Sequence, residues 1–231
     1  MAYDDLPEPV APVTLGGASE AARERAQAAA RAVFGQVMFL VAVSLGFTAI
    51  GAYIGRDLSG GASIGFFIAA FIAIIALRWV RGTTAPAMAL LFGAGLLLGL
   101  AIGPAVALYA NAPGGQTVVA QAAGATAIFV SAFGAWGYAT RRDLSSWYRA
   151  LFWGLIGLLA LGLVFIFVSI PGEYLVWSIL GLALFAGFTA FDFNRLRRAH
   201  PDQAVWIAAS IYLDIVNVFL FMLQLIGGSR S

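Results

Sequence analysis

Two carboxylates that lie inside apolar segments are the residues of this sequence best suited to do chemistry. Asp214 lies in the middle of the apolar run 204–226, and Asp192 lies in the preceding apolar run 174–196. A charged side chain at the centre of a membrane-spanning helix costs roughly 2.5–3.5 kcal/mol on insertion scales, so such a residue is usually turned inward, paired and functional. The other apolar segments contain no Asp or Glu. The two aspartates are therefore the main chemical clue.

The two carboxylates are expected at similar depths in the membrane. A short polar loop joins their helices, and at 1.5 Å per residue their distances from that loop differ by only ~6 Å. Asn217 and Ser210 share one helix face with Asp214, at i+3 and i−4. A polar stripe of this kind is hard to reconcile with a helix that faces lipid. The segment 204–226 is therefore predicted to be central in the fold.

A close pair of carboxylates has a specific chemistry in a medium of low dielectric. Both groups cannot ionise cheaply, so the pair is expected to titrate jointly and to share a proton. The shared proton would tie the two helices together, and its loss would push them apart or draw in a cation. This is a physical route to pH gating. The alternative is that each Asp pairs with an arginine or caps a helix, since Arg195 lies at i+3 from Asp192.

The same residues supply too few ligands for tight calcium binding. A tight site needs roughly six to eight oxygens, whereas Asp192, Asp214, Asn217 and a few carbonyls or waters provide fewer. We therefore expect transient calcium binding at the two aspartates and no tightly bound cofactor. The chain has no cysteine, which excludes thiolate metal sites, and its one histidine, His200, lies in a polar loop. Enzymatic activity is not expected.

The composition indicates an integral membrane protein. The chain of 231 residues is 61% hydrophobic and 10% charged, against about 25% charged in ordinary soluble domains. Seven apolar segments come near the ~20 residues that span a bilayer. They lie at about 34–54, 62–80, 85–109, 118–139, 149–169, 174–196 and 204–226. The predicted fold is all-α, a seven-transmembrane-helix bundle over 33–228, with the seventh helix central and the first six around it.

A polar tail, 1–32, precedes the bundle and is expected to lie in the cytoplasm. Residues 1–17 contain prolines and acids and are expected to be disordered. Ser19 is expected to cap a short helix, 20–33, that leads into the membrane. A cleaved signal peptide is not expected, because the first apolar segment begins late and is too long.

The arginines predict the orientation of the bundle. Positive charge gathers in cytoplasmic loops, and one side carries eleven arginines against two on the other. The N-terminus is therefore expected in the cytoplasm, and the C-terminus outside if the seventh helix spans, or inside if it is re-entrant. The net charge of +2 does not favour nucleic acid as a partner. The lipid bilayer is the expected environment.

The run 95-GLLLGLAIG-103 contains two overlapping small-xxx-small spacings. Small residues let the backbones of two membrane helices approach closely. Packing within the bundle is the expected role, and a dimer face is the alternative.

Three stretches resemble the Bax inhibitor-1 (transmembrane Bax-inhibitor-motif) family. They are 137-GYATRRDLSSWYRALFWGLIGLL-159, 186-AGFTAFDFNRLRRAH-200 and 209-ASIYLDIVNVFLFMLQLIGG-228. The resemblance covers all seven apolar segments and leaves the polar tail aside. It implies six helices around a central seventh and a pH-sensitive, passive calcium leak in a bacterial inner membrane, with Asp192 and Asp214 as the pH sensor. It also implies a basic residue after the second helix that latches one aspartate. Arg81 matches that position, although it is equally well explained as a positive-inside anchor.

Some features depart from the family or leave other functions open. Certain members carry an acid within the second helix, which has none here, so calcium affinity and selectivity are in doubt. An intramembrane aspartyl protease is disfavoured, because Asp214 follows Tyr-Leu and not Gly-x-Gly. A proton-coupled cation transporter is the stronger alternative. A third possibility is a regulator that binds another membrane protein, with no transport of its own.

Overall fold

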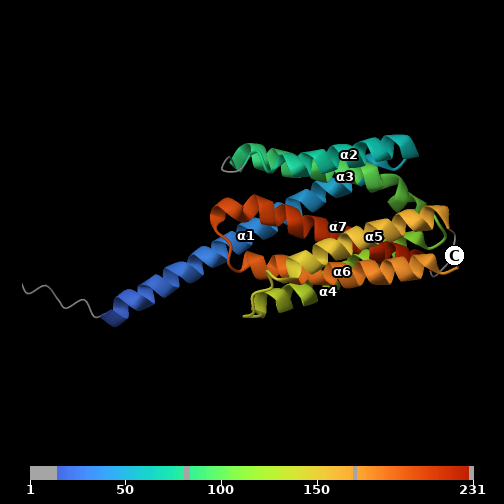
Figure 1. The fold of residues 1–231 in the computed structure, drawn as a ribbon. Coiled ribbons are helices and arrows are strands. Elements are labelled where there is room, and N and C mark those ends of the chain that lie inside the picture. Colours follow the sequence, from blue (N-terminus) through green and yellow to red (C-terminus); the bar gives the residue numbers. More distant parts are fainter. Residues whose placement is uncertain (1–14, 81–83, 169–170, 229–231) are drawn as a thin grey trace, which may run out of the picture.

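The computed structural model describes residues 15–80, 84–168 and 171–228. This part of the chain forms seven α-helices and one short 3-10 helix, with no strand (Figure 1). The α-helices are α1 (Leu15–Gly55), α2 (Gly60–Ala76), α3 (Thr84–Ala110), α4 (Gly115–Ala139), α5 (Trp147–Phe167), α6 (Glu173–Leu196) and α7 (Ala204–Gly228), with η1 (Pro201–Gln203) before α7. The predicted all-helical membrane bundle is confirmed.

The helices form two groups that meet at α7. In one group α3 packs against both α1 and α2, and in the other α6 packs against both α4 and α5. The last helix, α7, contacts α1, α3, α4 and α6 and runs through the middle of the bundle (Figure 1). Half of its most apolar stretch is buried, against a third or less in each other long apolar helix. The predicted central position of the seventh helix is confirmed, with α2 and α5 packed on the outside.

The first helix differs from the prediction. Residues 15–55 form one continuous helix of 41 residues, so the expected short helix 20–33 and the first span are a single element. Ser19 lies inside this helix and is not its cap. Ala, Glu and Arg dominate residues 20–31 and are good helix formers, so nothing there stops the helix. Its N-terminal part projects beyond the bundle (Figure 1). The expected disorder of residues 1–17 falls mostly on residues 1–14, outside the described part, while residues 15–17 are helical.

The second helix is shorter than predicted. It has 17 residues, about 26 Å at 1.5 Å per residue, whereas the hydrocarbon core of a bilayer is about 30 Å thick. It ends at Ala76, where the N–H of Leu77 bonds to the carbonyls of Ile74 and Ile75 and tightens the last turn. Six helices in the described part of the chain are long and apolar enough to cross a membrane, and α2 is not among them.

Gly95, Gly99 and Gly103 of α3 face α1 and allow the two backbones to touch. A Cβ atom built at Gly99 would lie 2.2 Å from the carbonyl oxygen of Thr48. At Gly95 and Gly103 the corresponding distances, to Ser44 and Ala52 carbonyl oxygens, are 2.8 and 2.7 Å. Such contacts leave no room for a side chain. The small-residue run therefore packs within the bundle, as expected.

This contact predicts a large difference between two glycines of the same helix. Gly99→Ala forces a methyl group into the α1 backbone and is expected to lower the free energy of unfolding by about 1–3 kcal/mol, typical of overpacking. Gly93 has open space around it, so Gly93→Ala is the matched control. Thermal unfolding of the two variants in detergent measures the difference. Equal melting temperatures would contradict the packing described.

Candidate functional site

The structure brings Asp192 of α6 and Asp214 of α7 together. Both carboxyl groups are buried, with 5% and 4% of their residues exposed, and they lie close enough for each to act on the charge of the other. The Oδ2 atom of Asp214 is buried and has no hydrogen-bond partner in the protein. The pair sits where α6 packs along the central helix. Each aspartate is therefore a close polar neighbour of the other.

Arg195 is a charged residue that lies close to Asp192. It lies one turn after Asp192 on α6 and is close enough to act on its charge. No ion pair joins the two residues, since those within the described residues are Arg56–Asp57 and Arg198–Asp143. The alternative in which Asp192 is satisfied by an arginine is thus not the arrangement seen.

The structure gives a different outcome for each of the other residues predicted around the aspartate pair. Asn217 donates its side-chain amide to the carbonyl oxygen of Leu213, 2.8 Å away on its own helix. Ser210 is half-buried. Arg81, the candidate latch, lies outside the described residues, so the structure places no contact for it.

Thr189 is a polar neighbour of Asp192 that the sequence analysis did not identify. It lies at i−3 from Asp192 on α6 and is fully buried. Its hydroxyl oxygen, like Oδ2 of Asp214, has no hydrogen-bond partner in the protein. Buried polar atoms nearly always have a partner. Two unpartnered oxygens on these facing helices are therefore available to a proton, a water molecule or a cation.

The opposite side of α7 is held by a second buried polar group. Tyr212 is fully buried, and its hydroxyl lies 2.7 Å from the hydroxyl of Thr48 on α1. Thr48 also donates to the carbonyl oxygen of Gly95 on α3, at 3.1 Å. Because Tyr212 and Asp214 are two residues apart on a helix of 3.6 residues per turn, they point to opposite sides. The central helix is thus anchored to α1 and α3 on one side and to α6 on the other.

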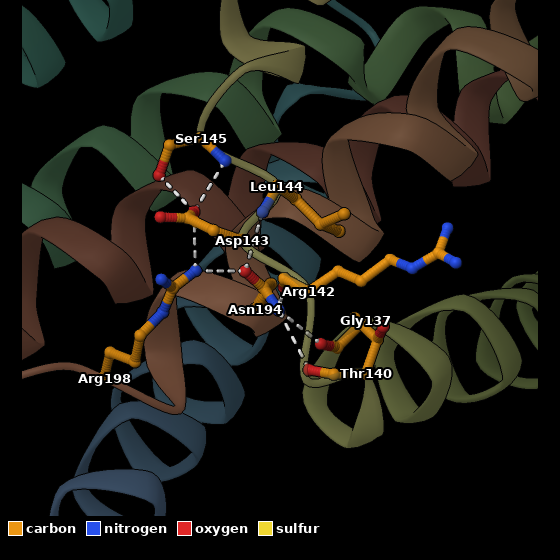
Figure 2. Close-up of polar contacts among 8 residues, drawn as sticks. All are labelled: Gly137, Thr140, Arg142, Asp143, Leu144, Ser145, Asn194 and Arg198. Atoms are coloured by element: carbon orange, nitrogen blue, oxygen red, sulfur yellow. Dashed lines mark hydrogen bonds and ion pairs between the residues drawn. The ribbon is translucent and has the colours of Figure 1, made fainter.

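Asn194 forms a hub two residues after Asp192. Its amide nitrogen donates to the carbonyl oxygens of Gly137, Thr140 and Arg142, and its oxygen accepts from the N–H of Leu144 (Figure 2). Residues 140–146 connect α4 to α5. One buried side chain therefore caps the end of α4 and holds the following loop against α6.

An ion pair extends this hub to the surface. The Arg198 guanidinium donates to Asp143 at 2.9 Å and also to the side-chain oxygen of Asn194 (Figure 2). Asp143 further accepts from the N–H and hydroxyl of Ser145. The hydrogen bond from Arg198, followed by those from Ser145, holds the pKa of Asp143 well below its usual range. A lowered pKa stabilises the fold above the unfolded value near ~4, and this stabilisation is lost as the pH falls further.

The sequence contains only a weak signal for this hub. Asn194 and Arg198 lie in the stretch 186–200, and Gly137, Thr140 and Asp143 lie in the stretch 137–159. These partners are more than 50 residues apart in sequence, so no helical spacing could pair them. A polar Asn near the end of an apolar helix was the available hint.

Comparison with known proteins identifies the family. A family model described as inhibitor of apoptosis-promoting Bax1 matches residues 30–231. The chain belongs to the Bax inhibitor-1 family. The match covers α1 from residue 30 onward, all of α2 to α7 and both aspartates, and it leaves out the first 29 residues. The resemblance inferred from the three motifs is confirmed.

Several bacterial proteins are similar to this Bax inhibitor-1 family member. A membrane protein of Vibrio cholerae is 34% identical over 57% of this chain and 59% of its own. A protein of Chlamydia muridarum is 31% identical over 80% and 83%. The inner membrane protein YbhL of Escherichia coli is 31% identical over 46% and 50%. The chain thus spans under three fifths of the length of the Vibrio relative and half of that of YbhL. The names of these two proteins assign them neither an ion nor a transport activity.

The hub makes a prediction about stability. Asn194→Ala leaves buried carbonyls and an N–H without partners, and each such group costs about 1–3 kcal/mol. We expect a clear fall in melting temperature in detergent and faster hydrogen exchange at the amide of Leu144. Asn217→Ala, which breaks a bond within one helix, is the control and should have a smaller effect. Unchanged exchange at Leu144 would show that the loop does not depend on Asn194.

Proposed function

We propose that this Bax inhibitor-1 family member is a passive calcium leak of the membrane, gated by the protonation of Asp192 and Asp214. The observation that supports the proposal is the buried, closely placed carboxyl pair between α6 and α7. A hydrogen bond between the two groups would require a proton, because two ionised carboxylates have only acceptors. Protonation and helix contact are therefore linked at this point of the bundle.

The mechanism follows from what happens when that proton leaves. Two negative charges in low dielectric repel strongly, and the repulsion is relieved if the helices separate or if a cation enters. The free Oδ2 of Asp214 and the hydroxyl of Thr189 would add oxygen ligands for a calcium ion. These are far fewer than the roughly six to eight of a tight site. Weak binding suits permeation, in which an ion must leave as readily as it enters.

Two other functions differ from the leak in whether calcium moves across the membrane and in what drives that movement. A proton-coupled cation transporter would move its ion uphill when a pH gradient is applied, since a buried protonatable pair also suits exchange. A regulator of another membrane protein would copurify with that protein and carry no flux. By the family resemblance, Arg81 remains a candidate for a cytoplasmic latch on one aspartate.

The first test is calcium efflux from proteoliposomes between pH 5 and 8. We expect a passive leak in the wild type that depends on pH, and loss of that dependence in Asp192→Asn and Asp214→Asn, because an amide cannot release the shared proton. Asp143→Asn is the matched control. Its carboxyl is already ionised throughout this range, because the hydrogen bonds from Arg198 and Ser145 lower its pKa.

The outcomes separate the candidate functions. A pH response that survives in both pair variants would reject the aspartate gate. Absence of flux at every pH, with the protein shown to be folded, would reject the channel and favour the regulator. Uphill calcium movement driven by a pH gradient would favour the transporter.

We further propose that the protein lies in the inner membrane of a bacterium with its N-terminus in the cytoplasm and its C-terminus outside. The distribution of arginines supports this orientation. Because the chain has no cysteine, single cysteines report it cleanly. Ser59→Cys and Ala112→Cys should react with an impermeant maleimide in intact cells, and Ser146→Cys only after permeabilisation. Labelling of Ser59→Cys and Ala112→Cys only after permeabilisation, with Ser146→Cys reactive in intact cells, would show the opposite orientation.

A further inference from the structure

A groove between α1 and α4 runs from the arginine-rich end of the bundle toward its middle. Its cavity has a volume of about 600 Å³. Exposed or half-exposed residues of α1 and α4 form the walls, and α6 and α7 form the floor, where the ring of Phe193 lies over Gly134. The described lining residues of α1 and α4 include Arg31, Phe34, Ser131, Ala135 and Tyr138. Asp192 and Asp214 are not among the described residues that line it.

The charge of the groove excludes a cation as its ligand. Among its described lining residues Arg31 is the one that carries a charge, and the rest are mostly apolar. The ion pairs of the described residues join Arg56 to Asp57 and Arg198 to Asp143, so Arg31 is not neutralised by a carboxylate. A guanidinium above an apolar cavity favours a molecule with an anionic head and an apolar body.

The depth of the groove matches one leaflet of a bilayer. Arg31 lies at the boundary on α1 where the polar, projecting segment gives way to the apolar run that begins at Val33. Tyr138 lies at the same end, with its ring 5.3 Å from that of Phe34, and tyrosine favours the headgroup level. From Tyr138 to Val130 the groove extends for eight residues of α4, about 12 Å. Half of a hydrocarbon core of about 30 Å is about 15 Å.

We propose that this groove binds an anionic phospholipid of the cytoplasmic leaflet, with its phosphate at Arg31 and an acyl chain along the floor. Basic pockets between membrane helices on the cytoplasmic side are typical sites for anionic headgroups. A cavity of this volume lies within the range of small-molecule sites, roughly 300–1,000 Å³. The bound chain would contact Phe193, which follows Asp192, and Ile215, which follows Asp214. The proposal does not depend on calcium transport.

A second cavity, of about 930 Å³, continues toward the other end of the bundle and shares Val130, Ser131 and Ile215 with the first. It is lined by α1, α3, α4 and α7. Its arginine, Arg56, is already paired with Asp57 at 3.2 Å and stacks on the ring of Tyr53. It therefore lacks a free charge for an anionic headgroup, and the lipid site is assigned to the first cavity alone.

The test is native mass spectrometry of the full chain in detergent, titrated with phosphatidylglycerol or phosphatidylcholine. We expect preferential retention of phosphatidylglycerol by the wild type and at least about fivefold weaker retention in Arg31→Gln and in Ala135→Trp, which fills the groove. The matched controls are Arg25→Gln, on the projecting part of α1, and Ala132→Trp, an exposed α4 residue outside the groove. Both controls should bind as the wild type does.

Three results would overturn the proposal. Equal retention of both lipids, unchanged in Arg31→Gln, would mean that the protein retains bulk lipid and has no specific site for an anionic headgroup. Loss in Arg31→Gln with full retention in Ala135→Trp would place the lipid outside the groove. A dimer that disappears in Ala135→Trp, with no lipid bound, would make the groove an interface between copies. If Ala135→Trp fails to fold, Ser131→Trp, one turn deeper in the same wall, replaces it.

Discussion

The burial of two carboxyl groups at one helix contact is the constraint on which the rest of this structure depends. Asp192 and Asp214 are each about one-twentieth exposed, and each lies close to the other. An unpaired charge at that depth is expensive. The pair is therefore stable only while α6 and α7 stay in contact and a proton is shared, or while a cation takes its place.

The surrounding helices hold the central helix at this contact from both sides. Tyr212 ties α7 to α1 and α3 through Thr48, and the glycines of α3 keep α1 close. Across the bundle, Asn194 fixes the end of α4 and its following loop to α6. The two helix groups are thus each held together by internal contacts and meet at α7. In the proposed gate, a change at the aspartate pair would act on the contact of α7 with α6.

The groove between α1 and α4 lies along the same boundary between the two groups. Its floor is made by residues adjacent in sequence to the two aspartates, whereas its mouth carries the charge of Arg31. The proposed cation route and the proposed anionic lipid have opposite electrostatic requirements. The carboxyls lie on the α6–α7 contact and the arginine lies at the α1–α4 opening, so the two proposed sites would be separate within one small bundle.

The sequence by itself determined the class of protein, the bounds of α2 to α7 to within a few residues and the inward position of the two aspartates. The length of the apolar segments and the rarity of charged residues within them can both be read from a short stretch of sequence. It did not predict the continuous α1, because an N-cap at Ser19 predicts a helix start there, whereas the run of strong helix formers joins the apolar span in one helix that begins at Leu15. The tertiary structure alone decided the shortness of α2, the Tyr212–Thr48 anchor, the Asn194 hub and the unpartnered Thr189. Each of these depends on an end geometry or on partners from distant helices, and the spacing of residues along one helix contains no such information.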